Sequence, residues 1–120
     1  MHVINRSERT PYFAEDGSIV RELAAPGNAP LTRHSVAEIR HPPGTASQEH
    51  YHTSAEEVYY VIGGQGRLRV DDQERSIRPG DVAVIVPGQR HKVWAEGEKD
   101  LVLLVTCVPA YSPDEVVFVE

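Results

Sequence analysis

A chain of 120 residues, 40% of them hydrophobic, suits one domain around one core, because domains usually hold about 100 to 150 residues. Eighteen acidic residues against twelve basic ones give a formal net charge of -6, and without a Lys/Arg stripe we expect no nucleic-acid partner. No apolar run approaches the roughly 20 residues that cross a bilayer, and the first residues lack an apolar signal core. We therefore expect a soluble, cytoplasmic protein with no membrane partner.

The first 34 residues have the least regular pattern. A turn is predicted at Asp16 to Ser18, a strand at Ile19 to Leu23 and a loop at Pro26 to Pro30. We expect this arm to wrap either the body of the domain or a partner subunit.

From Ser35 onward, short apolar or alternating runs are separated by Gly, Pro and Asp, a pattern typical of antiparallel strands joined by hairpins. No long amphipathic helix is predicted. The expected strands are Ser35 to Arg40, Glu49 to His52, Glu57 to Ile62, Arg67 to Val70, Arg75 to Arg78, Val82 to Val86, His91 to Trp94 and Leu101 to Val108. So many short strands predict an all-β barrel or sandwich with mostly local strand order.

Three histidines and a glutamate stand out by their spacing along these strands. His50 and His52 are two residues apart, so both side chains point to the same side of one strand. Glu57 opens the next strand after a short polar turn, and His91 opens a later one. In a small closed barrel all four side chains can face one interior point.

Three imidazoles and one carboxylate suit a divalent first-row transition metal and leave one or two positions for water or substrate. A single histidine in a barrel is more often a core or rim residue, but four such groups without a cation would be costly to desolvate. We therefore predict one bound ion, with Fe or Mn favoured and Ni, Zn, Cu or Co also compatible. Glu56 remains an alternative to Glu57, since a bulge in the turn would exchange their directions.

These residues resemble the two sequence motifs of the cupin family. The first motif is matched by Gly44, His50, His52, Glu57 and Gly64. The second is matched by Gly80, Gly88 and His91, whereas Val86 and Ala95 depart from it. The resemblance implies a jelly-roll barrel, also called a double-stranded β-helix, of the compact bacterial single-domain type. We expect one domain over 1–120, with the barrel core at about 35–108, an N-terminal arm at 1–34 and a C-terminal segment at 109–120.

Strand alternation also predicts which other residues line the pocket. Those on the same strand faces as the candidate ligands are Gln48, Tyr59, Val61 and Val93. Tyr59 is the candidate catalytic residue, as a proton or hydrogen-bond donor, although a tyrosine at such a position is more often packed in the core.

The remaining histidines and the single cysteine are not assigned to the site. His2, His34 and His41 match no ligand spacing, and we expect them at the surface or rim. Cys107 lies in an apolar run, where we expect a buried, inert thiol.

Three kinds of function fit this pattern. The favoured one is a metal-dependent enzyme on a small molecule, either dioxygenase-like or decarboxylase-, isomerase- or lyase-like. The alternatives are a non-catalytic small-molecule binding or sensing module and a purely structural barrel. We also expect a homodimer, because Ile19 to Leu23 and Val116 to Val119 are apolar terminal segments able to pair across a two-fold axis.

Overall fold

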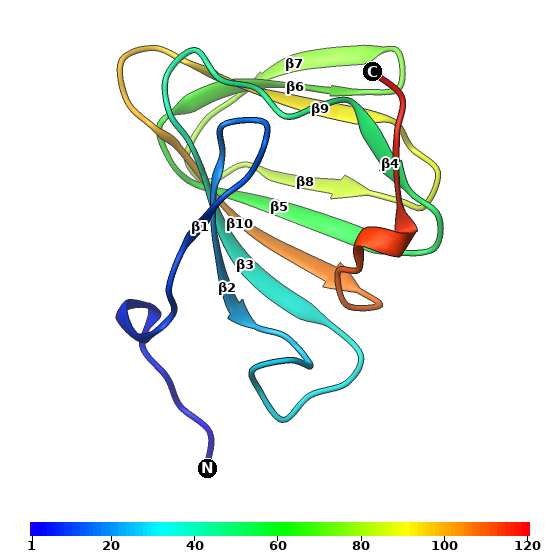
Figure 1. Ribbon diagram of the computed structural model, residues 1–120. Coiled ribbons are helices and arrows are strands. Elements are labelled where there is room, and N and C mark those ends of the chain that lie inside the picture. The colour runs from blue at the N-terminus through cyan, green and yellow to red at the C-terminus, as the bar shows by residue number, and fades with distance from the viewer.

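Two antiparallel sheets lie face to face in the computed structural model, which describes residues 1–120 (Figure 1). The six-stranded sheet has the order β1 Tyr12–Phe13, β2 Ile19–Ala24, β3 Ser35–His41, β10 Leu101–Val108, β5 Glu56–Gly63 and β8 Val82–Ile85. The five-stranded sheet has the order β11 Val116–Phe118, β4 His50–His52, β9 His91–Glu96, β6 Gln65–Val70 and β7 Gln73–Ile77. The all-β jelly-roll fold expected from the sequence is confirmed. The expected mostly local strand order is wrong, because most strands pair with strands that are distant in the chain.

Helical structure is confined to two short turns of 3-10 helix. These are η1, Arg6–Glu8, and η2, Pro113–Glu115, each of three residues. No helix has the length and apolar character that a membrane span requires.

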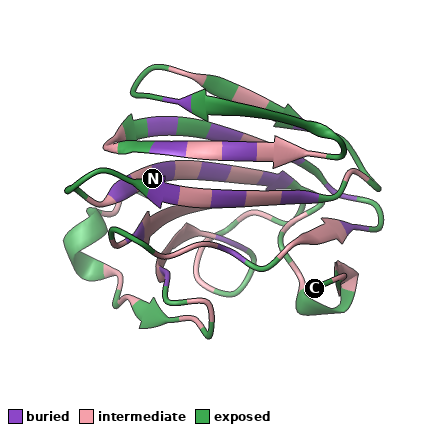
Figure 2. Cartoon of the chain, turned by 90° about the horizontal axis from the view of Figure 1, so that it is seen from above, coloured by how far each residue is buried: buried purple, intermediate pink, exposed green.

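The core lies between the sheets and follows the alternation of side chains along each strand. Along β10, Leu101, Leu103, Val105 and Cys107 are buried, whereas the residues between them are more exposed. Figure 2 shows this alternation as bands of buried and less buried residues along the strands. Along each strand, every second side chain therefore faces the interior.

All eight strands expected from Ser35 onward are present, with ends that differ by no more than two residues. The bounds of β10 agree at both ends. Strand β6 begins two residues earlier than expected, because Gln65 and Gly66 already pair with β9. Backbone pairing thus extends beyond the apolar run that predicted the strand.

The terminal segments pair within their own chain. Strand β2 pairs with β3 and carries β1 on its outer edge, while β11 pairs with the short strand β4. Both segments thus have partners inside the chain, and their expected pairing across a two-fold axis stays a prediction. Each segment covers an edge that β3 or β4 would otherwise leave open, which removes the need for a second subunit at those edges.

The turn between β5 and β6 requires glycine. Gly64 has φ of 78°, and a Cβ atom there would lie 2.1 Å from the carbonyl oxygen of Asp100. Any side chain would thus meet both backbone strain and a clash with fixed backbone. This contact explains why a glycine ends the first sequence motif, at the point where the chain passes from the six-stranded sheet to the five-stranded sheet.

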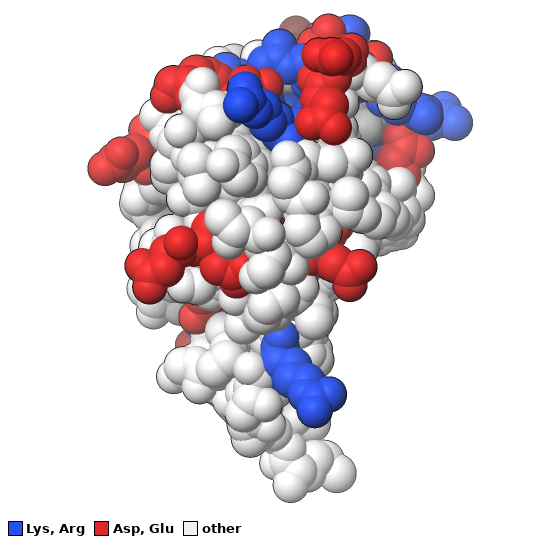
Figure 3. Space-filling view, turned by 90° about the vertical axis from the view of Figure 1, so that its right-hand side faces the viewer, with Lys and Arg blue, Asp and Glu red and all other residues white.

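Charged side chains are distributed unevenly over the surface. On the face shown in Figure 3, Lys and Arg lie near the two ends, and the charged side chains across the middle are acidic. That face therefore has no continuous basic stripe.

Candidate metal centre

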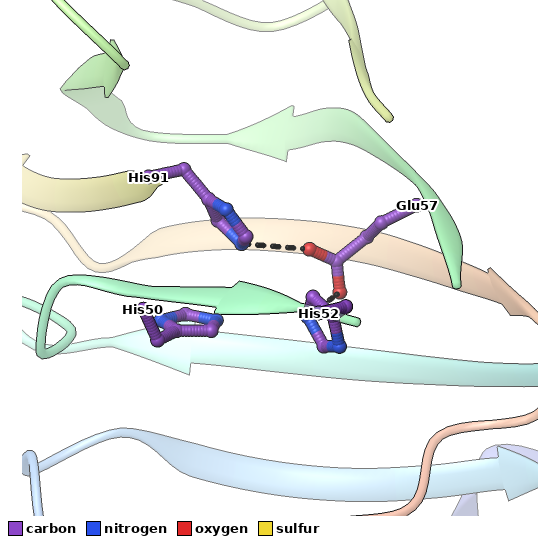
Figure 4. A group of neighbouring side chains, drawn as sticks. All are labelled: His50, His52, Glu57 and His91. Carbon is purple, nitrogen blue, oxygen red and sulfur yellow. Dashed lines mark ion pairs between the residues drawn. The ribbon is translucent and has the colours of Figure 1, made fainter. Parts of the chain in front are cut away.

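The four side chains singled out by their spacing come together at one point between the sheets (Figure 4). His50 and His52 project from β4, His91 begins β9 opposite His50, and Glu57 reaches across from β5 in the other sheet. One ligand atom from each residue lies within 4.8 Å of the other three. This group of three imidazoles and one carboxylate is typical of a metal site.

Three of these side chains are buried, and each has one atom in the cluster that lacks the hydrogen bond a buried polar atom normally makes. His91 Nε2 lies 3.0 Å from Glu57 Oε1, and His52 Nε2 lies 3.4 Å from Glu57 Oε2. Even so, His52 Nε2, His91 Nε2 and Glu57 Oε1 have no hydrogen-bond partner. Each such atom costs about 1 to 3 kcal/mol, and one cation between them would satisfy all three. The residues therefore fit a metal ion.

Backbone carbonyl groups orient two of the imidazole rings. His50 Nδ1 lies 2.7 Å from the carbonyl oxygen of Gln48, and His91 Nδ1 lies 2.9 Å from that of Gln89. An Nδ1–H group that donates to a carbonyl leaves Nε2 with the lone pair that binds a metal. The backbone two residues before each histidine thus presets its ring for coordination.

Glu57, and not Glu56, belongs to the cluster. Glu57 is buried, whereas Glu56 is exposed, and β5 pairs with β10 in continuous register at both positions. The irregularity in this pairing lies at Val102 and Leu103, far from the turn. Without a bulge at the start of β5, the directions of the two glutamates are not exchanged.

The surroundings of the cluster favour the protonation states that metal ligands need. Burial alone would raise the pKa of Glu57, but the interactions with His52 and His91 outweigh it and hold the pKa far below its usual range. Burial and the neighbouring His91 lower the pKa of His50. The site therefore favours an ionised carboxylate beside a neutral imidazole.

Cys107 contributes to the site, which strand alternation alone did not reveal. Its thiol donates a hydrogen bond to Glu57 Oε2 at 3.2 Å, and burial together with Glu57 raises its pKa far above the usual range. The thiol is buried and protonated, so it acts here as a hydrogen-bond donor. To predict this contact, one must know that Cys107 pairs with Glu57 across the two strands. The sequence alone does not indicate which residues of the two strands pair.

A cavity of about 430 Å³ adjoins the cluster. Of the predicted pocket residues, Gln48, Tyr59 and Val93 line this cavity. Val61 does not: it is buried in the hydrophobic core, so its assignment to the pocket is wrong. It lies four residues beyond Glu57 along β5, where the inward face of the strand is packed by core side chains instead of facing the cavity.

Tyr59 is placed between core and cavity. It is 6% exposed, and its ring centroid lies 6.0 Å from that of His91. Burial, with a further contribution from Glu57, raises its pKa. The hydroxyl group therefore stays protonated and is able to donate.

The cavity also takes residues from segments that the sequence did not assign to the site. The terminal strands and the segment after β10 supply Tyr12, Val20, Tyr111 and Phe118. No local pattern marks these residues, because they reach the cavity only through the pairing of β2 and β11 with the two sheets.

One histidine outside the cluster also lines the cavity. His41 is 2% exposed, so its expected place at the surface or rim is wrong. Its position follows from alternation along β3, which turns Ile39 and His41 to the same face. His2 and His34 are exposed, as expected.

Comparisons with known proteins agree with this architecture. Residues 37–107 match the family model described as Cupin domain. The uncharacterized protein MJ1618 of Methanocaldococcus jannaschii is 34% identical over 110 residues, which cover 92% of this chain and 88% of that protein. The oxalate-binding protein of Thermotoga maritima is 29% identical over 72 residues, which cover 60% of each chain.

A similar solved structure is that of Pac13, a nucleoside dehydratase from Streptomyces. It superposes with a TM-score of 0.83 over 100% of this chain and 92% of that chain. Its sequence is only 17% identical, so the likeness concerns the fold alone.

Proposed function

The chain belongs to the cupin family, and on that premise we propose that it is a metal-dependent enzyme acting on a small molecule. The observation that carries the proposal is a set of buried ligand atoms without hydrogen-bond partners beside an open cavity. The residues that would hold the ion are His50, His52, Glu57 and His91.

The donor set favours Fe or Mn, and Ni, Zn, Cu and Co are also compatible with three imidazoles and one carboxylate. A bound ion of this kind supplies Lewis acidity and, for the redox-active metals, electron transfer. The corresponding reactions are dioxygenase-like cleavage, or a decarboxylase-, isomerase- or lyase-like step.

The residues around the cluster have separate roles in this proposal. Tyr59 holds a proton at its hydroxyl group, beside His91, where it is available to a substrate. Cys107 fixes the orientation of the Glu57 carboxylate through its hydrogen bond. The apolar walls, which include Val93 and Leu103, exclude water from the substrate.

A non-catalytic small-molecule binding or sensing protein is the second candidate function. The Thermotoga maritima relative is named an oxalate-binding protein, which supports binding as a function of this family. The same metal centre would then anchor a ligand without changing it.

Metal-dependent turnover separates the two functions. Protein freed of metal and then loaded with Fe, Mn, Ni, Zn or Cu is screened with small carboxylates, sugars and catechols while oxygen uptake and product mass are followed. An enzyme shows turnover in at least one metal form, and Glu57→Ala abolishes it. The exposed neighbour supplies a matched control, Glu56→Ala, which retains activity. Turnover that survives complete metal removal contradicts the proposal, and ligand binding without turnover supports the second function.

We also propose that the chain forms a homodimer through the outer face of β5 and β8. Strand β8 is an edge of the six-stranded sheet, and the exposed apolar side chains there are Tyr60, Ile62, Val82, Val84 and Val86. A second copy would cover both this apolar surface and the unpaired strand edge.

A further inference from the structure

The cavity extends from the metal centre along the inner face of β3. Alternate residues of this strand line it, and these are Ser35, Ala37, Ile39 and His41. Ser35 pairs with Cys107, which contacts Glu57. His41 lies at the other end of the strand, about 20 Å from Ser35. The cavity thus has two ends, and only one of them holds the cluster.

The end at His41 contains a buried polar atom without a partner. His41 is 2% exposed, and its Nδ1 atom makes no hydrogen bond. Asp16 and Ser18, from the connection between β1 and β2, line the same cavity. Asp16 Oδ1 accepts a hydrogen bond from the Ser18 amide at 2.8 Å, which fixes the carboxylate in this connection.

The charges around the cavity have one sign. The acidic residues in its lining are Glu15, Asp16, Glu22 and Glu57, and neither lysine nor arginine lines it. An anionic group at the His41 end would therefore meet Asp16 without a compensating side chain. A carboxylate or phosphate placed there is disfavoured.

We propose that His41 and Asp16 form a second subsite, which binds a hydroxyl or protonated amine group of an elongated substrate whose other end reaches the metal centre. The proposal rests on the proposed function, because it assigns the substrate class of the same cavity. The His41 imidazole accepts a hydrogen bond from this group, and Asp16 adds a favourable charge. A substrate as small as oxalate cannot reach both ends.

Burial supports this role of His41. It lowers the pKa of the imidazole, although Asp16 opposes part of the effect. A neutral ring retains one nitrogen with a lone pair, which is the acceptor that a hydroxyl or ammonium group requires. In the substrate-free protein, the unpaired nitrogen lowers the stability of the fold. A loss of stability of this kind is more typical of a binding site than of a residue that only packs the core.

The first test measures which end group the cavity prefers. The probes are catechols with linear tails of increasing length that end in hydroxyl, ammonium, methyl or carboxylate, and calorimetry follows their binding to the Zn²⁺-loaded protein, in which they are not oxidised. At the best length we expect hydroxyl and ammonium tails to bind about five- to tenfold more tightly than methyl tails, and carboxylate tails most weakly. Equal affinities, or a preference for carboxylate, overturn the proposal.

The His41→Leu variant links this preference to the subsite. In this variant, probes with hydroxyl or ammonium tails should bind no more tightly than probes with methyl tails, and the affinity for methyl tails should equal that of the wild type. The His41→Gln variant, which keeps a hydrogen-bonding side chain, should retain part of the advantage. Exposed His34 supplies the control His34→Leu, which should behave as the wild type. If His41→Leu keeps the full advantage, His41 does not bind the end group.

A second measurement needs no metal, so it separates the subsite from the metal centre. In urea unfolding of the metal-free protein, His41→Leu should have a midpoint at or above that of the wild type, because an unpartnered buried polar atom is removed. A lower midpoint would mean that His41 packs the fold, and it overturns the proposal. A failure of Zn²⁺ to bind the wild-type protein contradicts the proposed function instead.

Discussion

The thiol of Cys107 donates a hydrogen bond to the carboxylate of Glu57 across the pairing of β10 with β5. A residue in an apolar strand therefore orients the only anionic member of the candidate metal cluster. Partners of this kind hold ligands in position, and their loss typically lowers metal affinity by about 10- to 100-fold.

This contact predicts that Cys107→Ala weakens metal binding by about tenfold. Cys107→Ser, which keeps a hydrogen-bond donor, should retain most of the affinity. Competition with a chromogenic chelator measures both. Equal affinities of the Ala variant and the wild type would show that the thiol only fills space.

Loss of a single imidazole should release the ion. In His52→Ala we expect little bound metal after purification without an affinity tag, as measured by elemental analysis. Its thermal stability should fall only to that of the metal-free wild type, since the hydrophobic core remains. At a free-metal concentration of about one hundred times Kd, that difference is about 3 kcal/mol. His34→Ala is the control, and a full metal content in His52→Ala would remove this residue from the ligand set.

The metal-free protein should become less stable in acid. Burial lowers the folded-state pKa of both His41 and His50 below the ordinary value of about 6.5. Between the folded and unfolded pKa values the unfolded chain binds more protons, so the free energy of unfolding falls as the pH drops below about 6.5. Urea titrations at a series of pH values should find this slope reduced in His50→Gln and in His41→Gln. A wild-type slope in both variants would assign the acid sensitivity to other groups.

The sequence predicted those parts of the fold and site that depend on local alternation. The spacing of His50 and His52 placed two imidazoles on one face of β4, and the apolar run from Leu101 gave β10 its correct bounds. The burial of Glu57 and the exposure of Glu56 followed from the regular start of β5.

What the sequence could not predict depends on pairing between distant segments. Cys107 contacts Glu57 because β10 and β5 run side by side in one register. The terminal strands likewise pair inside the chain, and neither composition nor periodicity distinguishes that from pairing with a second subunit. Val61 was misplaced because alternation gives the face of a strand but not the point at which a cavity ends and packed core begins.

If the chain forms a dimer through β8, one charged substitution in that interface should disrupt the dimer. Val84 and Val3 are both exposed, at 64% and 81%, but only Val84 lies in the proposed interface. Val84→Lys should give a monomeric mass by light scattering at micromolar concentration, whereas Val3→Lys should leave the dimer intact, because a buried lysine without a partner is costly at an interface. A monomeric wild type would remove the dimer altogether.

Removal of the Tyr59 hydroxyl group separates a role of this residue in catalysis from a role in packing. Phenylalanine keeps the ring that lies beside His91 and removes only the group that can donate a proton. In the active metal form, Tyr59→Phe should therefore lower kcat by about 10²- to 10⁴-fold while the metal content and KM change little. If the tyrosine only packs the core, kcat should stay near the wild-type value and only the stability should change. Single-turnover measurements on fully metal-loaded protein distinguish the two outcomes, because they report the chemical step without product release.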